Sequence, residues 1–352
     1  MSAEQYRAVR QGTGLLDRSH RGRVLVTGTD RIDYLQGLLT NDIAALGPGD
    51  GCYSAYLTPQ GRLIADLDLF NLGEAVLIDI HGDVKSFLIE RFRELVFAEE
   101  VEIDDWTETW TSFGLYGPSA ADVFEAAFEK SVDDGGATAV RRLQPHRCAR
   151  LSSRAGAVIL ARTDELGELG FSLFVERDGA AVAAQALVAA GGVEIDHETR
   201  DVVRVESGRP AFPDDMDQET IPLEAGIEDR AISDSKGCYV GQEVIIRILH
   251  RGQGRIARKL AGLTLGVEAT AADGDLRVPE KGAAVLSGDE AVGRVTSAAL
   301  SPTLGRVIAL GYLPRDLAEP GSRVSVALGA DRVEAIVTAR PFVTTGLRDW
   351  SP

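Results

Sequence analysis

Hydrophobic and polar residues alternate in short runs through the first hundred positions, a pattern that predicts strands separated by turns and helices. Residues 21–30, RGRVLVTGTD, are expected to form a strand that ends at a glycine turn. The next segment, 31–46, has apolar residues at helical spacing, with Thr29 or Asp30 as its N-cap. A second, amphipathic helix is expected over 84–97.

Two further strands are expected on either side of the Pro59–Gly61 turn in SAYLTPQGRLIADLDLF, residues 54–70. Side chains of a strand point alternately to its two faces. The second strand therefore separates an apolar face from a mixed face, with these members: Leu63, Ala65, Leu67 and Leu69 on one side, and Ile64, Asp66, Asp68 and Phe70 on the other. Another strand is expected in EAVLIDIHG, residues 74–82.

The pattern changes near the last third of the chain. Strand and helix patterns continue through the middle, with a helix expected at 178–192. After Lys259, short runs of Val, Leu and Ala alternate with Gly and Pro turns, and no helical pattern stands out. This pattern of short apolar runs and turns predicts a small all-β unit, a barrel, that begins near residue 257.

Composition restricts the class of protein. The 352 residues suffice for two or three domains, and 44% hydrophobic with 26% charged residues is typical of a soluble globular protein. No apolar run approaches the roughly 18 residues of a membrane span, and the first residues lack the apolar core of a signal peptide. We therefore expect a cytoplasmic protein, without membrane partners and monomeric.

The net charge of −17 argues against a broad nucleic-acid surface, because phosphates are repelled. Residues 244–267 depart from this trend, since they contain no acid. The bases of this cationic strip are Arg247, His250, Arg251, Arg255, Arg258 and Lys259. Two explanations stay open: the strip binds an anionic ligand or partner, or its arginines pair with acids elsewhere.

The three cysteines form no CxxC pair, so neither a disulfide framework nor a zinc or iron–sulfur site is expected, and we predict no protein-held metal. Cys238 lies in DSKGCYVGQEVIIR, residues 234–247. Lys236, two residues away, could favour its thiolate. A buried cysteine that acts as a small hydrophobe is the alternative.

Two carboxylates are candidates for ligand binding. Glu206 follows an apolar run, and if buried it needs a donor, which a planar ligand edge with two N–H groups or a neighbouring arginine would supply. If Asp66 points into a cleft, it could hold an amine-bearing ligand or act as a base, but its position in the sequence alone favours a surface location. Asp214, Asp215 and Asp217 miss the EF-hand spacing, and we interpret them as a solvated loop.

Three longer stretches carry a family resemblance. KGCYVGQE (236–243), followed by the cationic strip, resembles the signature of the YgfZ/Iba57 folate-binding proteins, which are relatives of the glycine-cleavage T-protein. GRLIADLDLFNLGEAVLIDI (61–80) and VVRVESGRPAFPDDMDQETIPLEAG (202–226) resemble segments of the wider superfamily. The resemblance covers nearly the whole chain.

The resemblance implies an α+β fold with a three-part cloverleaf: two α+β parts of the T-protein type and a C-terminal all-β barrel. The implied domains are 1–256, with two interleaved parts of which the second covers roughly 52–140, and 257–352 for the barrel. The implied cofactor is tetrahydrofolate or a one-carbon derivative, bound in a central pocket.

The resemblance also assigns roles to residues. Glu206 takes the place of the carboxylate that grips the pterin, and Asp66 that of the aspartate at the reactive folate nitrogens. Ile78 and Ile80 fall where the following strand lines the pocket. Cys238 is the implied reactive residue, activated by Lys236, and Arg247 belongs to the strip that could receive the folate tail.

Three functions follow from these residues. The first is a folate-binding accessory protein for the assembly or repair of iron–sulfur enzymes, including tRNA-modifying ones, with such enzymes or cluster carriers as partners and Cys238 as the reactive thiol. The second is a folate-dependent aminomethyl- or methyltransferase of the T-protein type that uses Asp66. The third is a binding module without chemistry.

Overall fold

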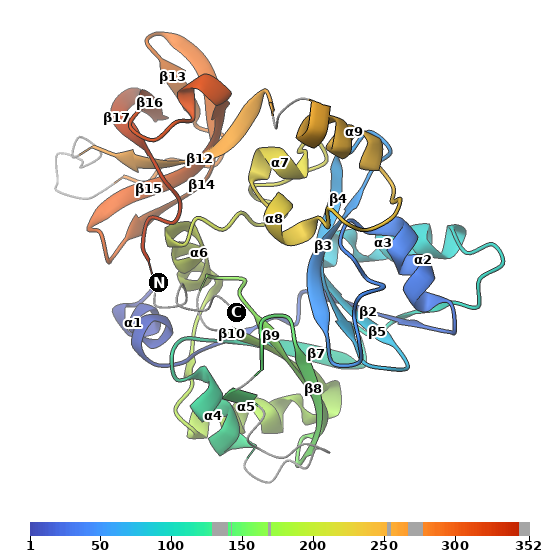
Figure 1. Cartoon of the computed structure of the whole chain (residues 1–352). Helices are drawn as coiled ribbons and strands as arrows, with labels where there is room; N and C mark the ends of the chain where they lie inside the picture. Colours follow the sequence, from blue (N-terminus) through green and yellow to red (C-terminus); the bar gives the residue numbers. More distant parts are fainter. Residues whose placement is uncertain (129–139, 142, 168–169, 252–254, 267–276, 345–352) are drawn as a thin grey trace. The chain divides into compact units, whose positions relative to one another are not determined.

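The structure is a computed structural model, drawn in Figure 1. The chain divides into two compact units. It describes residues 1–128, 140–141, 143–167, 170–251, 255–266 and 277–344. The first unit comprises Met1–Gln60, Ile64–Thr199 and Asp229–Gln242, and the second comprises Gly61–Leu63, Arg200–Glu228 and Glu243–Pro352. Each unit is described by itself below.

A five-stranded sheet with two helices on one face forms the first part of the first unit (Figure 1). Its strands lie in the order β3 (Gly51–Leu57), β4 (Leu63–Asn71), β5 (Val76–Ile80), β2 (Gly22–Thr27) and β6 (Glu102–Asp105). The helices are α2 (Arg31–Leu38) and α3 (Gly82–Glu94). Leucine, isoleucine and valine side chains of the strands pack against Leu35 and Phe92 of these helices.

The two faces of β4 differ as the alternation predicts from Ala65 to Phe70, whereas Ile64, expected on the mixed face, packs against the core beneath the helices. Leu67 and Leu69 are buried with the helices, whereas Phe70 belongs to a separate core on the other face. Asp66 and Asp68 are only partly buried. The helix predicted at 31–46 is shorter than expected, because α2 ends at Leu38.

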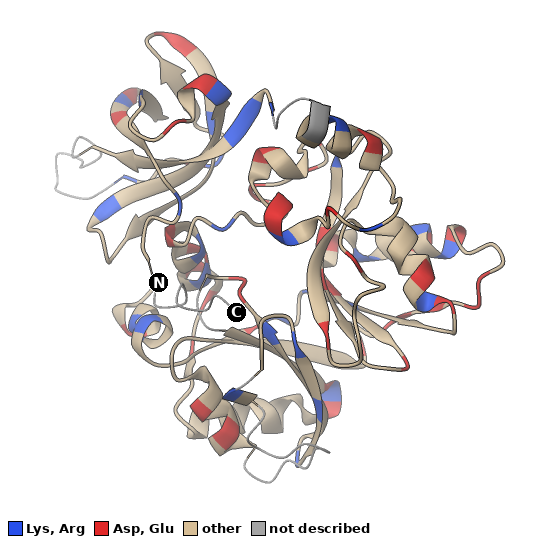
Figure 2. Cartoon of the chain, viewed as in Figure 1, with Lys and Arg blue, Asp and Glu red and all other residues tan. Residues whose placement is uncertain are grey.

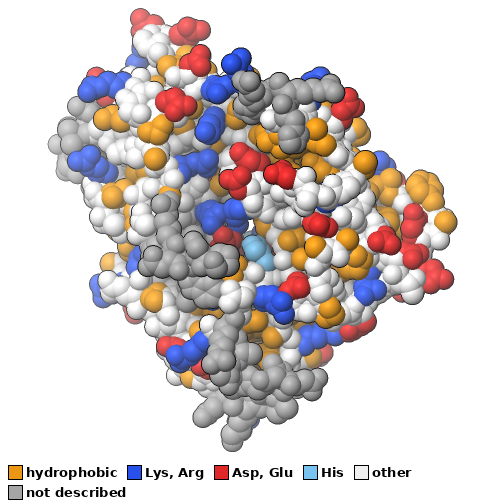
Figure 3. Space-filling model, in the orientation of Figure 1, with side chains coloured by type: hydrophobic (Ala, Val, Ile, Leu, Met, Phe, Trp, Pro, Cys, Tyr) orange, Lys and Arg blue, Asp and Glu red, His pale blue; other side chains and the backbone are white. Residues whose placement is uncertain are grey.

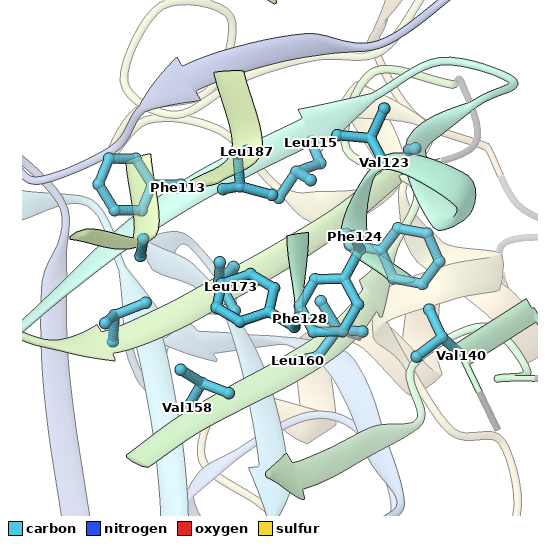
Figure 4. Close-up of a cluster of buried hydrophobic side chains, with 14 of the residues drawn as sticks. Phe113, Leu115, Val123, Phe124, Phe128, Val140, Val158, Leu160, Leu173 and Leu187 are labelled. Atoms are coloured by element: carbon cyan, nitrogen blue, oxygen red, sulfur yellow. The ribbon is translucent and has the colours of Figure 1, made fainter. Parts of the chain in front are cut away.

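A six-stranded sheet with two helices forms the second part of the first unit. The strand order is β11 (Val193–Glu194), β1 (Gly14–Asp17), β7 (Trp110–Tyr116), β10 (Gly170–Glu176), β9 (Gly156–Thr163) and β8 (Cys148–Ser153). Figure 4 shows Val123 and Phe124 of α4 (Ala120–Ala127) and Leu187 of α5 (Ala180–Ala189) packed on side chains of these strands.

The two sheets share a hydrophobic core of their own. Phe70 of β4 and Phe174 of β10 lie 5.9 Å apart, centroid to centroid, and both rings are fully buried. Leu25, Leu77 and Ile159 complete the contact between the sheets. This core holds the mixed face of β4 toward the second sheet.

A closed six-stranded barrel is the main element of the second unit. Its strands follow the order β12 (Arg258–Leu265), β15 (Arg306–Pro314), β14 (Glu290–Ser301), β13 (Ala284–Ser287), β16 (Arg323–Leu328) and β17 (Asp331–Thr338). The predicted fold class, two α+β parts followed by an all-β barrel, is confirmed. The predicted residue limits of the domains stay a prediction.

Shorter elements connect these parts: α1 (Ala3–Gln11), η2 (Arg177–Gly179), α6 (His197–Glu206), α7 (Pro222–Ala225), α8 (Glu228–Ala231), α9 (Gln242–Ile246), the π-helical turn η3 (Arg247–Arg251) and η5 (Arg315–Leu317). None of the helices described is both long and apolar enough to cross a membrane. Acidic and basic positions are spread along the chain (Figure 2), and Figure 3 shows them interspersed with hydrophobic side chains on the face that it presents.

The aspartates after α6 correct one interpretation. Asp215 is only 2% exposed and accepts hydrogen bonds from Arg204 at 2.5 Å and Thr296 at 2.5 Å, so it is not part of a solvated loop. Asp214 and Asp217 are more exposed, and each has its own surface cation. A carboxylate that is paired with a buried arginine fastens its loop within the second unit.

Removing a ring from the core between the sheets should destabilise the first unit. We expect Phe174→Ala to lower the free energy of unfolding by about 3–5 kcal/mol, because a large buried side chain is replaced by a cavity. The matched control is Phe97→Ala, since Phe97 is 83% exposed and should change stability by less than about 0.5 kcal/mol. Urea unfolding followed by circular dichroism measures both. Equal losses for the two variants would contradict this packing.

Candidate functional site

Three aspartates share the mixed face of the five-stranded sheet. Asp68 of β4 lies directly opposite Asp79 of β5, and Asp66 lies two residues along the same strand. On the other side of Asp79, Arg23 of β2 occupies the next register position. Carboxylates at directly opposite positions repel one another, so this arrangement requires nearby cations.

Asp79 receives two of these cations. The carboxylate is fully buried, and its two oxygens accept from Arg18 Nη2 and Arg21 Nε, each at 2.8 Å. Both arginines come from the segment between β1 and β2. Charge-assisted contacts at this distance are required to offset the cost of burying a charge.

Arg18 extends the network to the six-stranded sheet. Its guanidinium lies 3.3 Å from Glu165 and donates to the hydroxyl of Ser172. Tyr116 of β7 donates to the same Glu165 carboxylate at 2.9 Å. The charged residues of the two sheets therefore form one connected network within the first unit.

Asp66 lies two residues from Asp68 on this face, and it is partly buried. Tyr53 of β3 donates its hydroxyl to Asp66 Oδ2 at 2.8 Å, and the Arg230 guanidinium stacks over the Tyr53 ring at 4.6 Å. Arg230 is itself paired with Asp164 at 2.8 Å. Burial raises the pKa of the Asp66 carboxyl, and the hydrogen bond from Tyr53 opposes this effect.

Asp68 has weaker polar support. The imidazole Nδ1 of His146 lies 3.9 Å from Oδ1 of Asp68, and the Asp68 side chain is 16% exposed. Burial, followed by the charge of Asp79, raises the pKa of the Asp68 carboxyl to about 7, against the effects of Arg21, Arg18 and Arg230. This carboxyl therefore gains or loses its proton near neutral pH.

The side chains of Ile78 and Ile80 do not share this face, which corrects the assignment made from the resemblance. The register that sets Asp68 opposite Asp79 pairs Leu69 with Ile78 and Leu67 with Ile80. Both isoleucines are fully buried in the core beneath α2 and α3. Because strand side chains alternate, Asp79 is the residue of β5 that accompanies Asp66.

The side chain of Lys236 binds backbone carbonyls. Its ammonium donates to the carbonyls of Gln36, Leu39 and Asn41 at 2.5–2.8 Å, at the C-terminal end of α2. Burial lowers its pKa to about 8. An ammonium has three protons, so these bonds leave none for the Cys238 thiolate, and the lysine caps the helix whose last carbonyls would otherwise lack donors. Its predicted folate contact stays a prediction.

The cysteines differ in exposure. Cys238 is exposed, whereas Cys52 and Cys148 are buried, and burial raises their pKa values to about 12 and about 11. Of the two alternatives for Cys238, packing as a small buried hydrophobe is therefore wrong. Exposure alone does not make it reactive.

The remaining predicted residues lie in the second unit. Glu206 at the end of α6 is fully buried, and its carboxylate accepts a hydrogen bond from the Ser301 hydroxyl. Arg247, at the start of η3, is exposed. Within the cationic strip, Arg258 pairs with Glu224 at 3.1 Å, so for this residue the explanation by an acid elsewhere is confirmed.

Sequence reasoning missed Asp79, Arg18, Arg21, Tyr53 and Arg230. Asp79 gave a usable signal, because a carboxylate interrupts the apolar run of β5. The other four come from segments far apart in the chain, and no local pattern marks them. Among the residues that the structure describes, no group of His, Cys, Asp and Glu is arranged to hold a metal ion.

Two family models match the chain. That of the GCVT N-terminal domain matches residues 1–234, and that of the glycine cleavage T-protein C-terminal barrel domain matches residues 258–344. Together they cover the α+β parts and the barrel.

Individual relatives agree with these models. An aminomethyltransferase of Rubrobacter xylanophilus is 33% identical over 310 residues, which cover 88% of this chain and 78% of the relative. An aminomethyltransferase of Nostoc sp. is 30% identical over 354 residues, 96% of this chain and 86% of the relative. The crystal structure of glycine cleavage system aminomethyltransferase T from Bartonella henselae has the same fold, with a TM-score of 0.83 at 22% identity, over 97% of this chain and 89% of that one.

The helix cap provides a test of the role of Lys236. We expect Lys236→Met to lower the free energy of unfolding by about 1–3 kcal/mol, because three carbonyls lose a charged donor. Lys259→Met is the matched control, since Lys259 is exposed and should change stability by less than about 0.5 kcal/mol. Urea unfolding at pH 7 compares the two, and indistinguishable midpoints would refute the cap.

Proposed function

The chain belongs to the glycine cleavage T-protein family, and on that premise we propose that it is a folate-dependent aminomethyltransferase. Aminomethyltransferases of this family use tetrahydrofolate as the one-carbon acceptor, so the cofactor predicted from the sequence is confirmed. The observation that carries the proposal is the position of Asp66: a partly buried carboxylate, held by one tyrosine, on a face rich in charged side chains.

The donor set on this face suits a reduced folate. Carboxylates accept from the N–H groups of a pterin and its bridging amine, while arginine and tyrosine supply donors to its oxygens. Asp66 has one oxygen occupied by Tyr53, and no side chain of another described residue donates to its second oxygen. The bound cofactor would supply the nitrogens that accept the carbon.

Asp66 performs two tasks in this proposal. Its carboxylate orients the accepting nitrogen by hydrogen bonding, and its negative charge stabilises positive charge that develops on the amine donor. Tyr53 fixes the carboxylate in position, and Arg230 packs on Tyr53. A positioned group of this kind typically contributes a factor of about 10²–10⁴ to the rate.

The first function inferred from the sequence was wrong. An accessory role in iron–sulfur enzyme assembly and tRNA modification rested on the resemblance of KGCYVGQE to YgfZ/Iba57 proteins. The chain instead matches T-protein models over both of its parts, and relatives 26–33% identical over most of its length are aminomethyltransferases. The second function, which used Asp66, is the one that these findings favour.

The other predicted contacts with folate stay predictions. Glu206, whose buried carboxylate accepts from Ser301, keeps its pterin contact as a prediction from the sequence. The contact of Arg247 with the folate tail is likewise a prediction from the sequence. Cys238 has no part in the transfer step, so it serves as a control in the experiment below.

Replacing the Asp66 carboxylate should separate binding from transfer. We expect Asp66→Asn to lower kcat for one-carbon transfer to tetrahydrofolate by roughly 10²-fold or more, because the amide cannot stabilise positive charge. Tetrahydrofolate affinity, measured by calorimetry, should change by less than about tenfold. A reconstituted glycine-cleavage assay that measures methylene-folate output gives the rate.

Two control variants sharpen this test. Cys238→Ala should keep transfer within about twofold of the original chain, as should Asp83→Asn, whose carboxylate is 82% exposed. A large loss with Cys238→Ala together with full activity of Asp66→Asn would refute the proposed function, as would the absence of tetrahydrofolate binding by the unmodified chain.

A further inference from the structure

Asp68 has an environment that the transfer role of Asp66 does not explain. It lies two residues from Asp66 on the same face of β4, which is about 6.5–7 Å along a strand. Its carboxyl faces Asp79 across the sheet and His146 from the segment before β8. We propose that Asp68 and His146 form a proton-relay pair for the one-carbon transfer at Asp66, an inference that rests on the proposed function.

The arginines near Asp68 form ion pairs with other carboxylates. Both oxygens of Asp79 are held by Arg18 and Arg21, so most of the positive charge of those arginines is matched there. Arg230 is paired with Asp164. The titratable and charged groups that act on Asp68 or lie beside it are Asp66, Asp79, Arg18, Arg21, Arg230, His146, Tyr53 and Cys52.

This balance keeps the Asp68 proton exchangeable near neutral pH. Burial and the Asp79 charge raise the pKa of Asp68 to about 7, which is the range in which a carboxyl can act as acid and then as base. Burial also raises the pKa values of Tyr53 and Cys52, so both stay neutral there. Asp68 thus differs from Asp79, because each oxygen of Asp79 is bound by an arginine at 2.8 Å, whereas the His146 imidazole lies 3.9 Å from Asp68.

The backbone determines where the imidazole lies. His146 has a φ of +59°, the left-handed region, and it is the one residue other than glycine in the described part of the chain with a positive φ. Its N–H donates to the carbonyl of Arg162 at 3.0 Å, and the N–H of Cys148 donates to that of Gly49 at 2.8 Å. A conformation that is unfavourable for most side chains is thus maintained beside a carboxyl that titrates.

The proposed step has a simple proton balance. In the first half of the transfer, the bond between the carbon and its amine breaks, with the electron pair going to the amine. A bond from a folate nitrogen to the same carbon forms, while the carbon keeps its bond to the carrier that delivered it. Asp68 donates its proton to the departing amine, which leaves as ammonia. The carboxylate then accepts the proton that the folate nitrogen loses, so Asp68 returns to its starting state. His146 exchanges protons between this carboxyl and solvent.

The first measurement uses the protein without substrate. Infrared difference spectra, or carbon NMR of labelled aspartate, should show a protonated carboxyl at pH 6 that is lost by pH 8, and Asp68→Asn should lack it. His146→Asn removes the imidazole while asparagine tolerates the left-handed conformation. In that variant the midpoint should move, because the imidazole 3.9 Å from the carboxyl is lost.

The second measurement follows kcat for one-carbon transfer against pH. The unmodified chain should lose rate above about pH 7, as the acid form of Asp68 disappears. We expect Asp68→Asn to lower kcat by roughly 10²-fold and to abolish this pH dependence, with tetrahydrofolate affinity within about threefold. Asp83→Asn, on the surface, should keep the original profile.

The outcomes are distinguishable. An active Asp68→Asn variant with the original pH profile overturns the relay and leaves the proposed function intact. A chain that neither binds tetrahydrofolate nor transfers the carbon overturns both. If Asp68→Asn does not fold, the test uses the unmodified chain and His146→Asn. The relay is overturned if the unmodified chain has no carboxyl that titrates between pH 6 and 8, or if His146→Asn does not shift the midpoint of that titration.

Discussion

A buried carboxylate held by two arginines organises the polar face of the first unit. Asp79 is fully buried, and burying a charge is unfavourable unless partners reach both oxygens, as Arg18 and Arg21 do here. Arg18 also contacts Glu165 and Ser172 of the other sheet. The same ion pairs that stabilise Asp79 therefore connect the two sheets and determine how much positive charge remains for neighbouring carboxyls.

Two aspartates on one strand acquire different properties from this arrangement. Asp66 accepts a hydrogen bond from Tyr53, whereas Asp68 faces the carboxyl of Asp79 and an imidazole at 3.9 Å. Environment rather than residue type separates a carboxylate suited to electrostatic stabilisation from a carboxyl suited to proton exchange. A transferase that moves a carbon between nitrogens has a use for both.

The segment KGCYVGQE shows how a specific-looking motif can mislead about function. Its lysine caps α2 through three carbonyls, and its cysteine lies exposed beside that anchor. Part of the motif therefore has a structural purpose that is independent of thiol chemistry. The match of both parts of the chain to T-protein models carries more weight than eight residues, because it covers the sheets, the face with Asp66 and the barrel.

The sequence by itself determined the elements, the barrel, the two faces of β4 and the candidate carboxylate Asp66, because alternation and turn residues act over short distances. It also placed Asp79 inside an apolar run without showing why. Only the tertiary structure decided which face of β5 joins Asp66, and it buried Ile78 and Ile80 on the opposite side. Arg18, Arg21, Tyr53 and Arg230 could not be predicted, since their contacts join segments far apart in the chain. A carboxyl's pKa depends on all of those charges at once, and so it is a property of the fold.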